Sequence, residues 1–233
     1  MKNLWLIIGI IVLVLIGGSV WYATAVSRSN NEGVVLTEHL KGDSKATVTL
    51  TEYSDFQCPA CAQFEPVVAE LLAKYGSNIR FEYKHFPLIQ LHPVALLAAE
   101  ASEAAAVQNK FWEMHDKLFL NQEVWSKNPV PNKYFNEYAE EIGLDLKLFN
   151  KHLRSSLIKD KVQTEYKEAL QLGLTSTPSF LLNGQKMNIT TYQDFIEQVK
   201  NAVDPKIDLN ASAEIIKALA GEEETKNIAS TSN

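Results

Sequence analysis

The sequence predicts an α/β domain that follows a membrane-spanning helix. Three observations carry this prediction: a charge-free apolar segment near the N-terminus, runs of alternating apolar residues that indicate strands, and long segments with helical spacing. The elements come in the order strand, helix, strand, a long helical stretch, a hairpin and a last helix. A β-α-β unit and a β-β-α unit are therefore expected to share one mixed sheet, with the helical stretch inserted between them.

The first segment has no charged residue between Lys2 and Arg28. A hydrocarbon core needs about 20 apolar residues, whereas the apolar region of a secretory signal peptide has about 7–15. Because this segment is the longer type and has aromatic residues near both ends, residues 1–27 are expected to form a transmembrane signal-anchor with the N-terminus inside. The triplet Ala23-Thr24-Ala25 is typical of a cleavage site, so a cleaved signal remains the alternative.

Composition limits the classes of protein that remain. The chain has 233 residues, of which 46% are hydrophobic and 21% charged, which is enough for a packed core. Its formal net charge is −6 and its pI is about 5.4, and both disfavour a nucleic-acid partner. With two cysteines, the chain cannot form a scaffold of several disulfides or a four-cysteine zinc site.

Five regions are expected along the chain. Residues 28–44 are polar and predict a linker after the anchor. Residues 45–90 and 173–203 supply the strands and helices of the α/β domain, and residues 91–172 form a helical insertion. Residues 204–233 are expected to be a C-terminal extension that is partly disordered.

The first half of the α/β domain has clear local signals. Residues 47–53 and 79–86 alternate apolar and polar positions, which indicates two strands. Between them, the apolar residues from Cys61 to Tyr75 have helical spacing, and Gly76 marks the end of that helix.

The second half begins after the helical insertion. A short strand is expected within residues 177–184, followed by a hairpin turn at Asn183-Gly184 and a return strand at 186–189. Thr191 and Asp194 have the spacing of a capping box and predict the start of the last helix.

The two cysteines lie three residues apart, in Cys58-Pro59-Ala60-Cys61, between the first strand and the first helix of the α/β domain. Unpaired N–H groups and the helix dipole favour a thiolate on Cys58, so its pKa is expected to fall from about 8.5 into roughly the 3.5–7.5 range. Cys61 is expected to be more buried and to attack a mixed disulfide on Cys58. Pro59 suits the first helical turn, and Ala60 adds no charge near the sulfurs.

Redox chemistry is the favoured interpretation of this pair over two alternatives. A zinc site would need two histidines from positions 39, 85, 92, 115 and 152, and the sequence has no second close pair at metal spacing. A structural disulfide that closes so short a loop would gain little chain entropy. No metal and no other cofactor is therefore expected.

The sequence resembles the DsbA-like thiol:disulfide oxidoreductases over about residues 42–203. The resemblance lies in three segments: Ser54-Asp55-Phe56-Gln57-Cys58-Pro59-Ala60-Cys61, Phe111-Trp112-Glu113 with Phe119, and Thr177-Pro178-Ser179-Phe180. It implies a thioredoxin-like fold with an inserted helical domain, an extracytoplasmic location and the exchange of disulfides with other proteins.

The resemblance also implies a substrate-binding edge. Pro178 matches a proline that faces the two cysteines in the cis form, with an ordinary trans proline as the alternative. A fixed bend there would leave the backbone of Thr177 free to pair with an extended substrate. Pro59 and Ala60 are expected to contact substrate as well.

Glu52 matches an acidic residue that lies under the active site in this family. By strict alternation it shares a face with Val48 and Leu50, which favours burial over a solvent-facing glutamate. A buried carboxyl there has a raised pKa and could relay protons to Cys61.

Together these expectations describe a membrane-anchored extracytoplasmic thiol:disulfide oxidoreductase that oxidises dithiols of exported proteins. The resemblance implies that its partners are unfolded or reduced exported proteins and a quinone-linked membrane protein that reoxidises it. Two alternatives stay open: a reductase or isomerase that uses the same site, and a non-catalytic, chaperone-like binding module.

Overall fold

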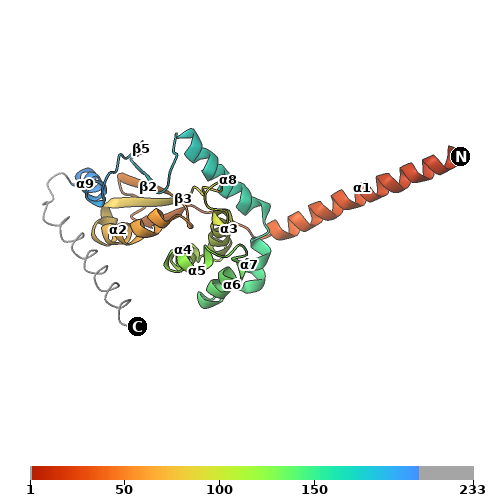
Figure 1. The fold of residues 1–233 in the computed structure, drawn as a ribbon, viewed down its shortest axis with the longest axis horizontal. Helices are drawn as coiled ribbons and strands as arrows, with labels where there is room; N and C mark the ends of the chain where they lie inside the picture. The colour runs from red at the N-terminus through yellow and green to blue at the C-terminus, as the bar shows by residue number, and fades with distance from the viewer. Residues whose placement is uncertain (1, 205–233) are drawn as a thin grey trace.

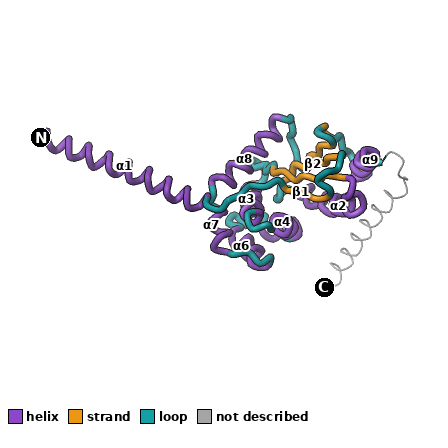
Figure 2. Tube along the Cα trace, turned by 180° about the vertical axis from the view of Figure 1, so that it is seen from behind, coloured by secondary structure: helices purple, strands orange, loops and turns teal. Residues whose placement is uncertain are grey.

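The computed structural model describes residues 2–204 and, within them, the side chains from residue 8 onward. Most of the expected C-terminal extension, residues 205–233, lies outside the described residues. The chain forms a long N-terminal helix, α1 (Lys2–Asn31), that projects from a domain made of a sheet and two groups of helices (Figures 1 and 2).

A mixed sheet of five strands forms the centre of the domain, in the order β1-β3-β2-β4-β5. Its strands are β1 (His39–Gly42), β2 (Val48–Ser54), β3 (Ile79–His85), β4 (Ser179–Leu182) and β5 (Gln185–Lys186). β2 and β3 are parallel, whereas the other pairings are antiparallel. This is the mixed sheet that a β-α-β unit and a β-β-α unit were expected to build.

Helices cover both faces of the sheet. α2 (Pro59–Tyr75) is followed by a short 3-10 helix, η1 (Gly76–Asn78), and lies with α9 (Tyr192–Val203) on one face, over Leu50 and Phe180. The other face packs Tyr53 and Leu181 against Ala169 of the inserted helices. α9 begins with the expected capping box between Thr191 and Asp194.

The helical insertion lies between β3 and β4 along the chain. Its helices are α3 (Ala95–Ala106), α4 (Phe111–Leu120), α5 (Gln122–Trp125), α6 (Asn132–Glu141), α7 (Leu146–His152) and α8 (Ser156–Gln171). α8 runs back along the sheet and contacts β3, which brings the insertion against the end of the sheet where β2 leads into α2 (Figure 1).

The structure of residues 28–44 differs from the linker that the sequence predicts. α1 continues to Asn31, because the Asn31 side chain binds the start of α8 and holds the last helical turn against the domain. β1 occupies His39–Gly42 and pairs with β3 as an edge strand. With four residues and a polar sequence, β1 has no alternation that could have revealed it.

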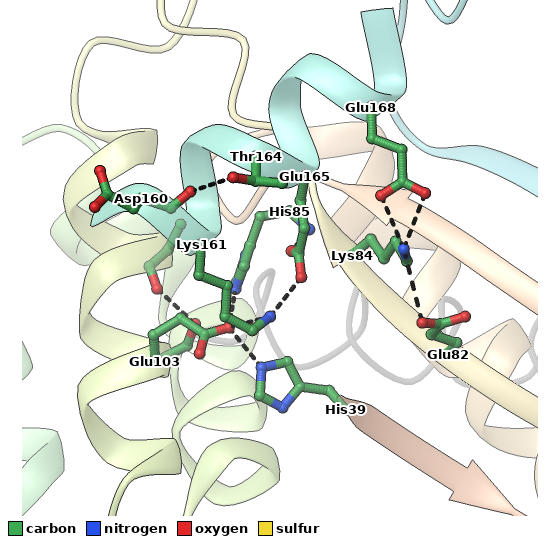
Figure 3. A network of polar contacts seen from close by, with 12 residues as sticks. His39, Glu82, Lys84, His85, Glu103, Asp160, Lys161, Thr164, Glu165 and Glu168 are labelled. Carbon is green, nitrogen blue, oxygen red and sulfur yellow. Dashed lines mark hydrogen bonds and ion pairs between the residues drawn. The ribbon is translucent and has the colours of Figure 1, made fainter. Parts of the chain in front are cut away.

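A buried ionic network joins the sheet to the insertion (Figure 3). Glu103 Oε1, on α3, accepts hydrogen bonds from His39 Nε2 at 2.5 Å and His85 Nε2 at 2.9 Å. Lys161 Nζ, on α8, lies 3.0 Å from the same oxygen. The network therefore ties β1 and β3 to two helices of the insertion at one carboxylate.

Candidate active site

Cys58 lies where β2 leads into α2. It is the N-cap residue of α2, with φ −75° and ψ 121°, and Pro59 is the first helical residue. Its carbonyl oxygen accepts the first backbone hydrogen bond of the helix, from Ala62 N at 3.2 Å. Its position just before the first helical turn is the one that the sequence predicts for the reactive cysteine.

The loop before Cys58 is held by a buried aspartate. One carboxylate oxygen of Asp55 accepts from Gln57 N at 2.7 Å, and the other accepts from Leu88 N at 2.9 Å and His92 Nδ1 at 2.7 Å. His92 therefore stabilises the active-site loop from outside, a contact between residues 37 positions apart that no local pattern indicates.

The insertion also binds this loop directly. Gln122 Nε2, on α5, donates hydrogen bonds to the carbonyl oxygens of Phe56 at 2.8 Å and Cys58 at 2.9 Å. These two carbonyls lie on either side of Gln57, whose own amide donates to Ser126 O at 3.0 Å. The backbone around Cys58 is thus fixed by side chains from both parts of the domain, and sequence reasoning missed Gln122.

The two sulfurs have different access to solvent. Cys61 is fully buried, whereas Cys58 keeps 7% of its surface exposed beside the exposed residues Pro59 and Ala60. Both cysteines are free thiols in this structure. A thiolate from another molecule can therefore approach Cys58 over Pro59 and Ala60 but has no path to Cys61.

Thr177 faces Cys58 from the other side. The Thr177-Pro178 bond is cis, as the resemblance implies. Cys58 Sγ donates a hydrogen bond to Thr177 O at 3.4 Å. The carbonyl group expected to pair with an extended substrate therefore lies against the sulfur that would react.

The environment separates the pKa values of the two cysteines. A hydrogen bond with Cys61 lowers the pKa of Cys58 to about 6 against the effect of burial, with help from the side chain of Thr177 and the N–H groups of Cys61 and Ala60. Burial raises the pKa of Cys61, and the neighbouring Cys58 and Glu52 raise it further. At neutral pH the dithiol therefore holds a thiolate on Cys58 and a proton on Cys61.

Glu52 lies beneath this pair, on β2, and is fully buried, as strict alternation predicts. Neither of its carboxyl oxygens has a hydrogen-bond partner among the described residues. Burial, and then repulsion from Glu65, raises the pKa of Glu52 to about 8. The carboxyl can therefore hold or release a proton close to neutral pH.

A buried imidazolium lies near Glu52, on α4. His115 Nδ1 donates to Asp116 Oδ1 at 2.8 Å, and its Nε2 lies 3.5 Å from Glu65 Oε1. Burial opposes its charge, but Glu65 and Asp116 outweigh burial and raise the pKa of His115 to about 9. Asp116 is the next residue in the sequence, whereas the contact with Glu65 exists only because α4 packs on α2.

The only group of possible metal ligands within residues 2–204 lies elsewhere. It consists of His39, His85 and Glu103, with ligand atoms within 4.8 Å of one another. The ammonium of Lys161 already supplies a positive charge at the shared Glu103 oxygen (Figure 3). This group contains neither cysteine, so it does not match the zinc alternative built on Cys58 and Cys61.

Comparison with known proteins places this geometry in a family. The sequence pattern of the family described as Thioredoxin matches residues 35–201. The chain belongs to the thioredoxin family. The match covers the sheet, the helical insertion, Cys58 and α2 with Cys61.

Solved structures of other proteins have the same fold. "Wolbachia pipientis alpha-DsbA1" has a TM-score of 0.63 at 22% identity, over 82% of this chain and 99% of that one. "BdbD from Bacillus subtilis (oxidised)" has a TM-score of 0.63 at 20% identity, over 74% of this chain and 94% of that one. The expected DsbA-like thioredoxin fold with a helical insertion is therefore confirmed.

In the curated relatives, the segment that is similar to this chain is one part of a longer protein. "Na(+)/H(+) antiporter NhaA 3" of Salinispora tropica is 41% identical over 149 residues, which is 64% of this chain and 22% of that protein. "Na(+)/H(+) antiporter NhaA 1" of Mycolicibacterium gilvum is 36% identical over 153 residues, or 24% of its length. This thioredoxin-family chain thus spans about a fifth to a quarter of the length of these relatives.

One helix of the described chain is long and apolar enough to cross a membrane. It is the part of α1 from Ile8 to Asn31, with a mean hydropathy of 2.0 and no buried residue in the window. A signal sequence near an N-terminus has the same properties. The helix is therefore compatible with both expectations, the anchor and the cleaved signal.

Proposed function

We propose that this protein is a membrane-anchored thiol:disulfide oxidoreductase that acts outside the cytoplasm and oxidises dithiols of exported proteins. The observation that carries the proposal is the division between the two cysteines. Cys58, at the N-cap of α2, has a pKa of about 6, while Cys61 behind it is fully buried and protonated. A disulfide whose outer sulfur leaves as a stable thiolate is a good oxidant.

The reaction begins from the Cys58–Cys61 disulfide. A substrate thiolate attacks Cys58 Sγ, forms a mixed disulfide and releases Cys61, which takes up a proton. A second substrate thiolate then attacks the substrate sulfur of the mixed disulfide and releases Cys58 as a thiolate. Two electrons pass from the substrate to the pair of cysteines, and the substrate leaves with a disulfide.

Three groups assist these steps. Glu52 supplies the proton to Cys61 when it leaves and removes it when Cys61 attacks, because the Glu52 pKa of about 8 lets the carboxyl exchange protons near neutral pH. Thr177 pairs its backbone with an extended substrate beside Cys58. Pro59 and Ala60 form the exposed surface over which the substrate approaches.

The proposed membrane location is supported by α1. α1 has the length and composition of a single-pass anchor, and the N-terminus would lie inside. A quinone-linked membrane protein is proposed to reoxidise the dithiol, since each round of substrate oxidation leaves the pair reduced.

Two measurements test the proposal. In the refolding of a reduced, unfolded protein with glutathione disulfide as the oxidant, Cys58→Ser should abolish the catalysed disulfide formation. Cys61→Ser, whose Cys58 is first oxidised by glutathione disulfide, should pass to a mixed disulfide with the substrate and accumulate it, whereas the double variant should trap nothing. The equilibrium with glutathione should give a reduction potential well above the roughly −270 mV of a reducing thioredoxin. A potential near that value would indicate the reductase. Refolding rates unchanged by both cysteine variants would instead indicate a chaperone-like binding module.

A further inference from the structure

The end of α1 is bound to the turn between α7 and α8. Asn31 Oδ1 accepts hydrogen bonds from Ser155 Oγ at 2.8 Å and from Ser156 N, at the start of α8, at 3.0 Å. Glu32 forms an ion pair with Lys151 of α7 at 3.3 Å. Both views show α1 leaving the domain beside α7 and α8, with the sheet on the other side of the insertion (Figures 1 and 2). The α7–α8 turn is therefore the part of the domain that contacts the end of α1.

This turn has a charge opposite to that of the whole chain. Residues 146–159 contain four basic residues and no acidic one, whereas the chain has a formal net charge of −6. We name this segment the basic corner; its basic residues are Lys147, Lys151, Arg154 and Lys159. Lys147, Arg154 and Lys159 are exposed, and within residues 2–204 only Lys151 of the four has an ion-pair partner.

Two exposed leucines lie among these charges. Leu148 and Leu157 keep 41% and 37% of their surface accessible. Apolar side chains flanked by lysine and arginine are typical of surfaces that rest at a membrane interface, because the apolar groups enter the headgroup boundary while the cations stay at its polar side.

The length of α1 sets the height of the basic corner above the bilayer. Asn31 is three residues beyond Arg28, a rise of about 4.5 Å along the helix axis, and the headgroup layer is roughly 5–8 Å thick on each side. Counted from Tyr22 at the aromatic end of the apolar segment, the rise to Asn31 is about 14 Å. Whether the membrane surface lies at Arg28 or at Tyr22, the basic corner is within about one Debye length of the headgroups, so its charges can interact with them.

We propose that the basic corner docks on the anionic phospholipid headgroups of the membrane that α1 enters. The inference rests on the anchor part of the proposed function. Docking at the basic corner would hold the helical insertion against the lipid, and the sheet and α2 would face away from it (Figure 1). Cys58 would then stay open to exported proteins rather than to lipid.

The test uses the full chain in lipid nanodiscs, with lysine labelling by a water-soluble acylating reagent read by mass spectrometry. Nanodiscs of phosphatidylcholine are compared with nanodiscs of equal parts phosphatidylcholine and phosphatidylglycerol. Each basic residue near an anionic leaflet strengthens association roughly fivefold. Labelling of Lys147 and Lys159 should therefore fall about fivefold with phosphatidylglycerol and recover near 1 M salt, where the Debye length is about 3 Å. The exposed lysines Lys45, Lys167 and Lys186 should be labelled equally in both lipids.

A matched pair of variants sharpens the test. Arg154→Glu reverses one charge of the basic corner without altering the labelled lysines and should remove most of their protection. Lys167→Glu makes the same charge change near the other end of α8 and should leave the protection intact. Equal labelling of Lys147 in the two lipids would overturn the docking alone. A chain that does not co-purify with nanodiscs would overturn the anchor and the docking together.

Discussion

Glu52 and Glu103 are both buried glutamates, with 0% and 1% of their surfaces exposed, yet the protein treats them in opposite ways. Within residues 2–204, Glu52 has no hydrogen-bond partner for either oxygen, and burial raises its pKa to about 8. Burial would also raise the pKa of Glu103, but hydrogen bonds from His39 and His85 outweigh burial and hold that pKa well below its usual range. Burial alone therefore does not set the charge of a carboxyl group; its partners do.

The two buried glutamates have different roles in the protein. Glu103 is a permanent anion that joins β1, β3, α3 and α8, and its value is structural (Figure 3). Glu52 is held near the point of titration beneath the two cysteines, where a proton can be given or taken. A site that must change its charge cannot be fully satisfied, whereas a structural anion must be.

The largest effect is expected at Glu103. Glu103→Ala removes the hydrogen-bond partner of His39 and His85 and one of the two carboxylates that face Lys161, the other being Glu165. Removing one partner of a buried ion pair costs about 3–5 kcal/mol. Chemical denaturation measures the loss. Glu100→Ala is the matched control, because Glu100 is also buried on α3 but has no ion-pair partner among the described residues. Equal losses in the two variants would contradict the structural role of Glu103.

The pH dependence of this loss has a defined sign. Because the folded pKa of Glu103 is lowered, the stabilisation is complete above the unfolded pKa of about 4.5 and disappears as the pH falls through the folded value. The difference between the native protein and Glu103→Ala should therefore shrink below about pH 4.5.

At Glu52 the change of stability with pH is expected to have the opposite sign. Between pH 4.5 and about 8 the unfolded chain loses the Glu52 proton while the folded protein keeps it, so stability falls as the pH rises across this range. Glu52→Gln keeps the shape and removes the titration. The variant should match the native protein near pH 4.5 and exceed its unfolding free energy by roughly 4 kcal/mol at pH 8. A native stability curve with the same slope as the variant would show that Glu52 is ionised in the fold.

The sequence predicts where Glu52 lies beneath the cysteines, but it does not predict the network around Glu103. Glu52, Cys58 and Cys61 lie within one strand-to-helix segment, so period-two alternation and helix N-terminus physics place all three correctly. His39 and Glu103 are 64 residues apart, and their contact exists only once the insertion has packed on the sheet. The strand β1 was missed for the same reason, since its pairing with β3 is set by tertiary contacts rather than by its own four residues.

The active-site loop shows the same division. The N-cap position of Cys58 and the cis bond before Pro178 follow from local sequence and resemblance. Gln122 binds the loop across 64 to 66 positions of sequence, and a glutamine in a helical segment has no pattern that marks it as a partner of two carbonyls. Local patterns thus predict where Cys58 and Pro178 lie, whereas the side chains that hold them in place require the fold.

The smallest expected effect concerns the rate of one step. When Cys58 carries a mixed disulfide with 5-thio-2-nitrobenzoate, attack by Cys61 releases the coloured thiol, and absorbance follows it. In the native protein this rate should rise as the pH passes about 8, because ionised Glu52 can then take the Cys61 proton. Glu52→Gln should lack that rise and be about tenfold slower at pH 9, a difference of about 1.4 kcal/mol in the barrier.

The same experiment distinguishes proton transfer from charge. Ionised Glu52 also raises the pKa of Cys61, so if its negative charge were its only influence, Glu52→Gln would accelerate the release above pH 8 rather than slow it. Glu82→Gln is the matched control, since Glu82 lies on the neighbouring strand opposite Thr51 and so on the other face of the sheet. A release rate in Glu52→Gln that equals or exceeds the native rate at pH 9 would remove Glu52 from the proton path and leave it only as a charge beneath the site.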